Sequence, residues 1–119
     1  MKCHRVIAVL LLAVGPAFAH HSFAMYDVTQ TRTITGTVQQ FRWSNPHVVI
    51  VVEIAGPSPQ IWSVELTSPG NLRRKGWTRH SLKPGEIVSL QIYPLRDGGH
   101  GGGFQSGHLA DGSALGPAG

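Results

Sequence analysis

Hydrophobic and polar residues alternate with a period of two along several stretches of the chain, and this pattern is typical of β-strands. Within residues 31–41, Ile34, Gly36 and Val38 share one face while threonines occupy the other, which predicts a strand with one face toward water. Residues 47–54 are largely apolar on both faces, so we expect this strand to be central in its sheet. The pattern predicts three further strands, over residues 61–66, 87–93 and 104–110.

One short helix is predicted between the third and fourth strands. Ser68 suits the N-cap, Pro69 the first helical position, and Gly76 the left-handed residue that ends a helix. Residues 97–103 hold five glycines and one histidine, and we expect a mobile loop there. We also expect residues 113–119 to form a flexible tail.

Three strands, a helix and two strands in this order predict an all-β domain over residues 31–112, namely a small five-stranded Greek-key barrel of the OB type. An open antiparallel sheet and an SH3-like barrel are the alternatives. Gly36, inside the first strand, marks the kind of bend or bulge that a barrel needs. Residues 20–30 are expected to be an extended segment before the barrel. Five aromatic residues are expected to supply much of the apolar core: Phe41, Trp43, Trp62, Trp77 and Tyr93.

Residues 1–19 have the features of a secretory signal peptide. Basic residues precede an apolar run of nine residues, Val6 to Val14, and residues 17–19 match the small-x-small pattern of a cleavage site. Nine helical residues, at about 1.5 Å each, are too few to span a hydrocarbon core of about 30 Å. We therefore expect cleavage after Ala19 and a periplasmic or secreted chain without a transmembrane anchor.

Composition limits the partners of the mature chain. Cleavage would remove Lys2 and Arg5, which lowers the formal net charge from +4 by two, to +2. So small a charge, without a concentrated basic stripe, argues against a nucleic-acid partner. The single cysteine, Cys3, would leave with the signal peptide, so the domain must be stabilised by its core without disulfides.

Histidines near the expected new N-terminus are the strongest candidates for chemistry. Cleavage after Ala19 would make His20 the first residue, and its α-amine and ring Nδ1 can chelate one metal ion. A further imidazole from His21 or His47 would give three nitrogen ligands, a set that favours copper, and Met25 could add a thioether. Cleavage one residue earlier would make Ala19 the first residue and His21 the third. A histidine at the third position of a chain is another motif that binds copper and nickel. The alternative is a polar start that holds no metal.

The other histidines give weaker signals. For His47, the alternative to a metal ligand is a turn histidine bonded to the backbone near Asn45 and Pro46. His80, His100 and His108 lack the spacing of a zinc site. Copper is therefore the one cofactor that the sequence suggests, and no cofactor is certain.

A second hypothesis is a metal-free module that binds a peptide, a glycan or a protein surface. Its ligand would lie on an open face of the barrel near Trp43, Trp62 or Tyr93, and the alternative is that these aromatic residues belong to the core. The basic residues 73–75 and Arg79 favour a solvated helix face, with an anionic partner or membrane headgroups as the alternative.

The sequence shows no set of residues that is typical of a catalytic site. Glu53 and Glu65 lie on different predicted strands, and paired carboxylates on strands are as often surface charges. Ser22 lies near His20 and His21, but no third group is visible that would orient them. We therefore expect that the protein is not an enzyme.

Several stretches together resemble a family of small exported bacterial proteins catalogued as a domain of unknown function. They are residues 20–27, which begin His20-His21-Ser22-Phe23, residues 36–38, residues 41–47, which contain Trp43-Ser44-Asn45-Pro46-His47, and residues 72–77, 82–86, 96–98 and 109–112. The resemblance covers nearly the whole mature chain. It implies export and a small β-barrel, and it implies no activity and no catalytic residue.

Overall fold

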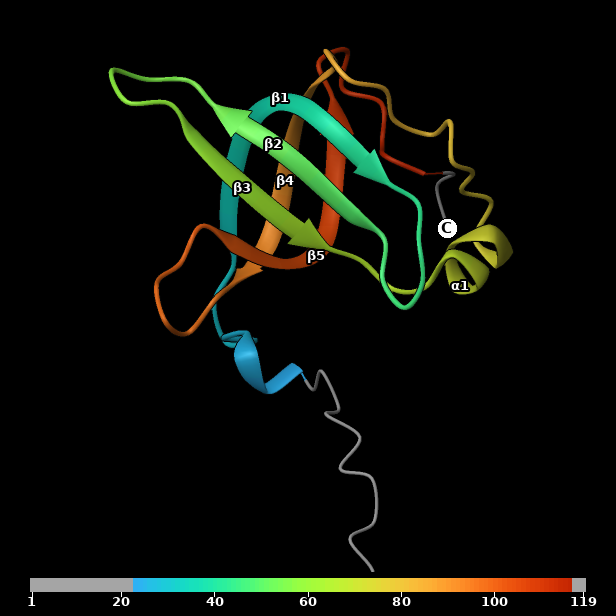
Figure 1. Cartoon of the computed structure of the whole chain (residues 1–119), viewed down its shortest axis with the longest axis horizontal. Coiled ribbons are helices and arrows are strands. Elements are labelled where there is room, and N and C mark those ends of the chain that lie inside the picture. Colours follow the sequence, from blue (N-terminus) through green and yellow to red (C-terminus); the bar gives the residue numbers. More distant parts are fainter. Residues whose placement is uncertain (1–22, 117–119) are drawn as a thin grey trace, which may run out of the picture.

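The computed structural model describes residues 23–116, and their five strands close into a barrel (Figure 1). The pairing order is β1-β2-β3-β5-β4, with β4 returning to β1, and every pair is antiparallel except β3 with β5. The closed ring confirms the predicted all-β barrel with one short helix and excludes the open sheet. The strands are β1 (Arg32–Arg42), β2 (Val49–Ile54), β3 (Gln60–Glu65), β4 (Ile87–Pro94) and β5 (Gly101–Leu109).

Strand β1 bends as it joins two neighbours, β2 on one edge and β4 on the other. A Cβ at Gly36 would lie 2.5 Å from the carbonyl oxygen of Glu53, so glycine permits the close approach of β1 to β2. The bulge itself follows, where the register shifts between Val38 and Gln40. The expected irregularity in this strand is therefore present. The close approach occurs at Gly36, and the bulge begins two residues later, at Val38.

Inward positions of every strand form the core, as the alternation predicts. On β4, Val88, Leu90 and Ile92 are all buried, and Trp62 and Val64 of β3 are buried as well. Burying this apolar surface is the main favourable contribution to folding in a domain whose described part has no cysteine. The largest fully buried side chains are Val38, Val48, Ile50, Val52, Val64, Val88, Leu90 and Ile92.

The glycine-rich segment 97–103 differs from our expectation. Its last three residues are the first three of β5, and they pair in parallel with residues 63–65 of β3. A Cβ at Gly101 would lie 2.9 Å from the carbonyl oxygen of Ser63, and one at Gly102 would lie 2.5 Å from that of Tyr93. The prediction of a loop up to residue 103 was wrong, because the glycines here allow close packing of the backbone between two strands.

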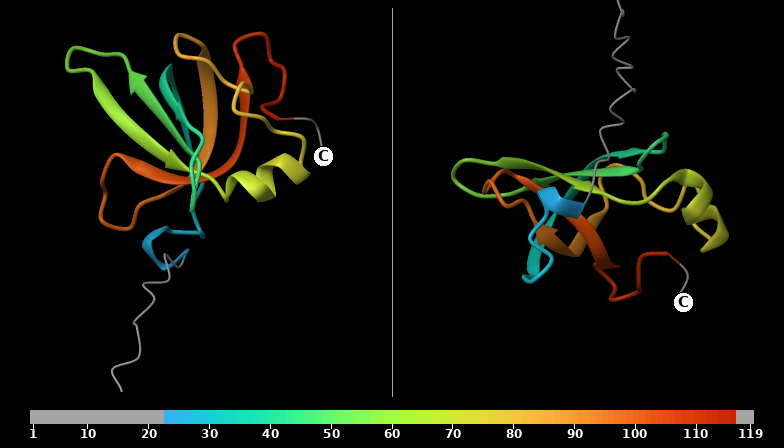
Figure 2. Two further views of the ribbon diagram at one scale, coloured as in Figure 1. Left: turned by 45° about the vertical axis from the view of Figure 1, so that its right-hand side comes forward. Right: turned by 90° about the horizontal axis from the view of Figure 1, so that it is seen from below.

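Helix α1 (Pro69–Arg74) has the predicted ends. The Ser68 hydroxyl accepts a hydrogen bond from the amide of Asn71 at 3.2 Å, Pro69 is in the first turn, and Gly76 has a φ of 83°. The helix extends from one side of the barrel and buries Pro69 and Leu72 (Figure 2). Within residues 23–116, no helix is long and apolar enough to cross a membrane.

Both ends of the described chain pack on the barrel. The 3-10 helix η1 (Phe23–Met25) leads to Tyr26, which is buried and pairs with Leu95. The flexible tail expected from residue 113 does not begin there, because the amide of Leu115 donates to the carbonyl of Gly107 at 2.8 Å. The Leu115 side chain packs against the core. Residues 1–22, with the expected signal peptide, His20 and His21, and residues 117–119 lie outside the described part.

Replacing Gly102 by alanine should destabilise the barrel, because the added Cβ would overlap the Tyr93 carbonyl. We expect the free energy of unfolding in urea to fall by about 1–3 kcal/mol. The matched change Gly56→Ala meets no atom within 4 Å and should have an effect within about 1 kcal/mol. Equal effects of the two changes would contradict the proposed role of Gly102 in barrel closure.

Candidate functional site

A cavity of about 850 Å³ opens where β3 and β5 separate. The parallel pairing of these strands ends at Glu65 and Gly103, and the residues that follow on each strand line opposite walls. The volume falls within the range of about 300–1,000 Å³ that is typical of small-molecule sites. The apolar part of the lining is formed by Leu66, Leu72, Trp77, Phe104 and Leu115.

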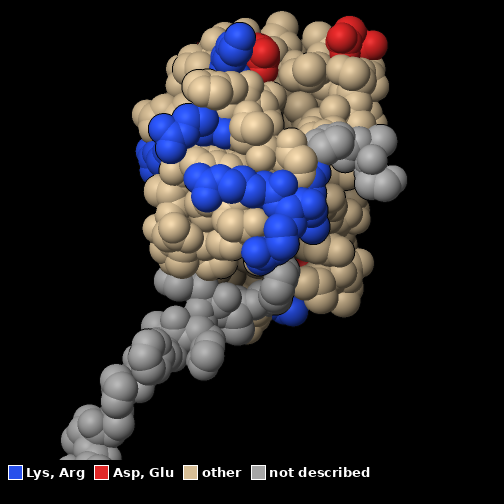
Figure 3. Space-filling model, turned by 90° about the vertical axis from the view of Figure 1, so that its right-hand side faces the viewer, with Lys and Arg blue, Asp and Glu red and all other residues tan. Residues whose placement is uncertain are grey.

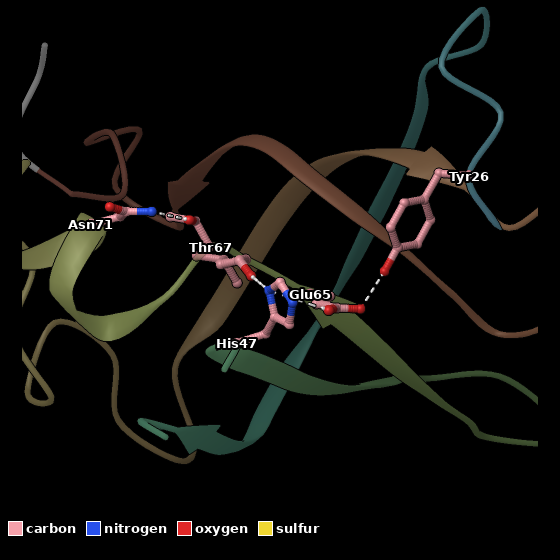
Figure 4. A network of polar contacts seen from close by, with 6 residues as sticks. Tyr26, His47, Glu65, Thr67 and Asn71 are labelled. Carbon is pink, nitrogen blue, oxygen red and sulfur yellow. Dashed lines mark hydrogen bonds and ion pairs between the residues drawn. The ribbon is translucent and has the colours of Figure 1, made fainter. Parts of the chain in front are cut away.

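Tyr26, Glu65 and His47 form a polar cluster in the wall of this cavity (Figure 4). The Tyr26 hydroxyl donates to Glu65 Oε2 at 2.5 Å, and Glu65 Oε1 lies 3.4 Å from His47 Nδ1. Burial and the Glu65 carboxylate both raise the pKa of Tyr26 above its ordinary value. The phenol therefore keeps its proton at neutral pH and serves as a hydrogen-bond donor to Glu65.

The tautomer of His47 follows from its other partner. Nδ1 lies 3.1 Å from the backbone carbonyl oxygen of Leu66, and because a carbonyl only accepts, Nδ1 must donate. In the neutral ring, the lone pair is then on Nε2, the nitrogen that a metal or a donor group would meet. His47 is thus bonded to backbone, as expected from the alternative in which it is not a metal ligand. Its partner is the carbonyl of Leu66, directly after β3, and not the backbone near Asn45 and Pro46.

Two basic residues line the same cavity as Glu65. Arg74 ends α1, and Lys75 is its C-cap. Arg74 donates to the side-chain oxygen of Asn71, whose amide nitrogen donates to the Thr67 hydroxyl at 2.8 Å. Figure 3 shows Lys and Arg side chains gathered on this side of the molecule, with acidic side chains mainly at its upper edge.

The three aromatic residues of the alternative hypothesis do not meet in one site. Trp62 is 2% exposed, with the His100 ring stacked on it at 5.1 Å between centroids, so Trp62 is a core residue. Trp43 is half-buried and contacts Phe41 edge-on at 5.8 Å. Tyr93 is half-buried on β4, and none of the three lines the large cavity.

Of the three candidate metal ligands, the structure describes His47 alone. His20 and His21 lie outside the described residues. Among residues 23–116, no three histidine, cysteine or acidic side chains are grouped closely enough to hold a metal ion. Met25, the candidate thioether ligand, lines the same cavity as His47 and is 42% exposed.

The polar cluster includes two residues that sequence reasoning did not select. Tyr26 and Glu65 are 39 positions apart, and nothing in the local pattern around either residue indicates the other. Glu65 was considered only together with Glu53, which lies on the same face but pairs with Ile61, four positions before Glu65 on β3. The one available signal was Tyr26 itself, a large aromatic residue in a segment with no predicted strand or helix.

Replacing Tyr26 by phenylalanine should remove the bond to Glu65 while keeping the ring that packs on Gly103. We expect a loss of about 1 kcal/mol in unfolding free energy, at the low end for a bond to a charged group because Glu65 is partly exposed. Tyr93→Phe, which removes a hydroxyl that makes no hydrogen bond within residues 23–116, is the matched control.

The same bond predicts a pH dependence with a definite sign. Because folding raises the pKa of Tyr26, its contribution is complete below the ordinary value of 10.0 and is lost as pH rises through the folded-state pKa. The stability difference between wild type and Tyr26→Phe should therefore persist at neutral pH and shrink in strong alkali. A difference that is absent at neutral pH would exclude the bond.

Comparison with known proteins supports the fold and identifies a family. No curated protein matches the sequence. The crystal structure of Rim1, a mitochondrial single-stranded DNA-binding protein from S. cerevisiae, superposes with a TM-score of 0.52 at 7% identity. The match covers 68% of this chain and 93% of that chain, and it confirms the OB-like barrel. A family model described as a family of unknown function, DUF6152, matches residues 8–105, and the chain belongs to this family.

Proposed function

We propose that this protein is an exported binding protein whose barrel holds a small ligand in the cavity between β3, α1 and β5. The observation that carries the proposal is the cavity itself, which combines a suitable volume with an apolar lining and a few convergent polar groups. Export rests on the signal-peptide pattern of residues 1–19, with cleavage after Ala19.

The chemistry of the lining favours binding over catalysis. Trp77, Phe104 and Leu115 offer apolar contact area, and Trp77 is held by an edge-on contact with Phe104 at 5.8 Å. Glu65 is the carboxylate in this lining; the Tyr26 phenol already donates to it, and the His47 ring lies 3.4 Å from it. A carboxylate so occupied is suited to fixing the shape of the wall, not to taking a proton from a substrate.

Nucleic acid is not the ligand that we propose. Proteins that bind single strands stack bases on exposed aromatic rings along a positively charged groove. The outward positions of β2 and β3 carry instead Val49, Glu53, Ile61, Ser63 and Glu65. Likeness to a DNA-binding barrel at 7% identity therefore concerns the fold alone.

Filling the cavity should weaken binding. Ala114 lines it with an exposed side chain, so Ala114→Phe adds a ring there without disturbing the buried core. We expect the mature protein to bind the neutral fluorescent probe N-phenyl-1-naphthylamine, and Ala114→Phe to weaken this by about tenfold or more. Ala110→Phe, the same change at an exposed position outside the lining, is the control. A wild type that does not bind the probe would contradict the proposal.

Copper binding through the processed N-terminus is the second candidate, and one observation favours it. Metal-binding histidines usually donate their second ring nitrogen to a carbonyl or carboxylate, and His47 Nδ1 does so toward Leu66 and lies beside Glu65. Tyr26, bonded to Glu65, is six positions after His20, a span of at most about 20 Å. His20 and His21 are thus tethered within reach of His47.

A copper titration tests this candidate separately. We expect the mature protein beginning at His20 to bind Cu(II), and an added N-terminal methionine to weaken binding by about 100-fold or more. His47→Gln should weaken it as well, while His80→Gln, which changes an exposed histidine, should not. Indifference to the added methionine would exclude the N-terminal site, and mass spectrometry of the exported protein would establish where the chain begins.

A further inference from the structure

The cavity lining carries both an acidic group and basic groups, and within residues 23–116 only the acidic group has an ion-pair partner. Glu65 is bonded by Tyr26 and lies beside His47. Arg74 and Lys75 line the cavity where α1 stops. The ion pair between His47 and Glu65 is the one recorded within residues 23–116, so neither basic residue has a described carboxylate partner.

Arg74 is oriented by its neighbours without being neutralised. Its guanidinium donates to the Asn71 side-chain oxygen, and the Asn71 amide in turn donates to Thr67 at 2.8 Å. This chain fixes the direction of the guanidinium and leaves its charge in place. Holding a binding group in one geometry reduces the entropy that a ligand must offset. Both Arg74 and Lys75 are exposed, so an anion can reach their charges directly, and the apolar walls beside them offer contact to the rest of a ligand.

We infer that the ligand is a small amphipathic anion, a carboxylate joined to an apolar body, and this inference rests on the proposed function of the cavity. The carboxylate would lie against Arg74 and Lys75, and the apolar body would lie along Leu66, Trp77 and Phe104. A cationic ligand would meet two uncompensated positive charges. A neutral apolar ligand would fit the walls and leave the basic pair unused.

Two nearby basic residues, Arg73 and Arg79, allow binding in the cavity to be distinguished from a general attraction of the basic surface for anions. All four basic residues are exposed, but Arg73 and Arg79 do not line the cavity, whereas Arg74 and Lys75 do. Arg73 is directed toward Trp43, with its guanidinium carbon 5.8 Å from the centre of that ring. A ligand held by the cavity should therefore depend on Arg74 and Lys75 and be indifferent to Arg79.

Three probes of equal chain length test the ligand class on the mature protein: decanoate, decanol and decylammonium, each followed by the change in tryptophan fluorescence. We expect decanoate to bind at least about tenfold more tightly than decanol, and decylammonium most weakly. Lys75→Gln should weaken decanoate by about fivefold to tenfold and leave decanol unchanged. Lys75→Arg should restore decanoate binding, and Arg79→Gln should match the wild type. Thermal melting confirms that each variant is folded.

The outcomes distinguish this inference from the proposed function. Equal binding of decanoate and decanol, with no effect of Lys75→Gln, would overturn the anionic class, while binding of the naphthylamine probe would leave the cavity function standing. Decanoate binding that Arg79→Gln weakens as much as Lys75→Gln would place the anion on the basic surface and would overturn the inference too. Failure of the naphthylamine and of all three probes would overturn both proposals.

Discussion

Closure of the barrel depends on a backbone-to-backbone fit at β5 that only glycine permits. Gly101 and Gly102 lie between the carbonyl of Ser63 on one side and that of Tyr93 on the other, where a Cβ would come within 2.9 and 2.5 Å. Gly103 continues this bare surface, and a Cβ there would lie 3.3 Å from the Tyr26 ring. The three glycines therefore close the ring of strands and provide the flat surface on which Tyr26 rests.

The cavity is a consequence of how short this seam is. Only three residue pairs join β3 to β5, from Ser63 with Gly101 to Glu65 with Gly103. Beyond them, β3 leads into the loop before α1, while β5 continues along β4 to Leu109. Since α1 is six residues long and buries Pro69 and Leu72, it lines the gap without filling it. The fold thus leaves a space bordered by side chains at the one place where the ring is held by the fewest bonds.

Much of the barrel could be predicted from the sequence, because the patterns that specify its strands and its helix depend on residues close together in the chain. The alternation around Ile34 and Val38 and the capping residues of α1 each depend on neighbours within a few positions. The start of β5 could not be predicted in this way. A run of glycines has the same composition in a loop and in a strand that must approach two others closely, and only the strands that meet it, near Ser63 and Tyr93, distinguish the two.

The candidate site was less predictable than the fold for a related reason. His47 was selected from its residue type, but its partners are Glu65, the last residue of β3, and Leu66, which follows it. Trp62, selected as an aromatic platform, alternates inward with Val64 and is buried. Residue type identifies groups that can bind, whereas the register of β2 against β3 decides which of them face a cavity and which face the core.

Part of the cavity lining comes from segments outside the five strands. Met25 and Tyr26 approach it from the start of the described chain, Ala114 and Leu115 from its end, and Lys75 from the segment after α1. These segments lie outside the main strand ladders, so their side chains can change with little effect on barrel closure. Closure of such a barrel depends on glycines, whereas part of its lining comes from the periphery. The architecture can therefore stay the same while a few side chains determine which ligand would bind. For the anionic ligand that we propose, the paired acid and the two basic residues of the lining would make that selection electrostatic.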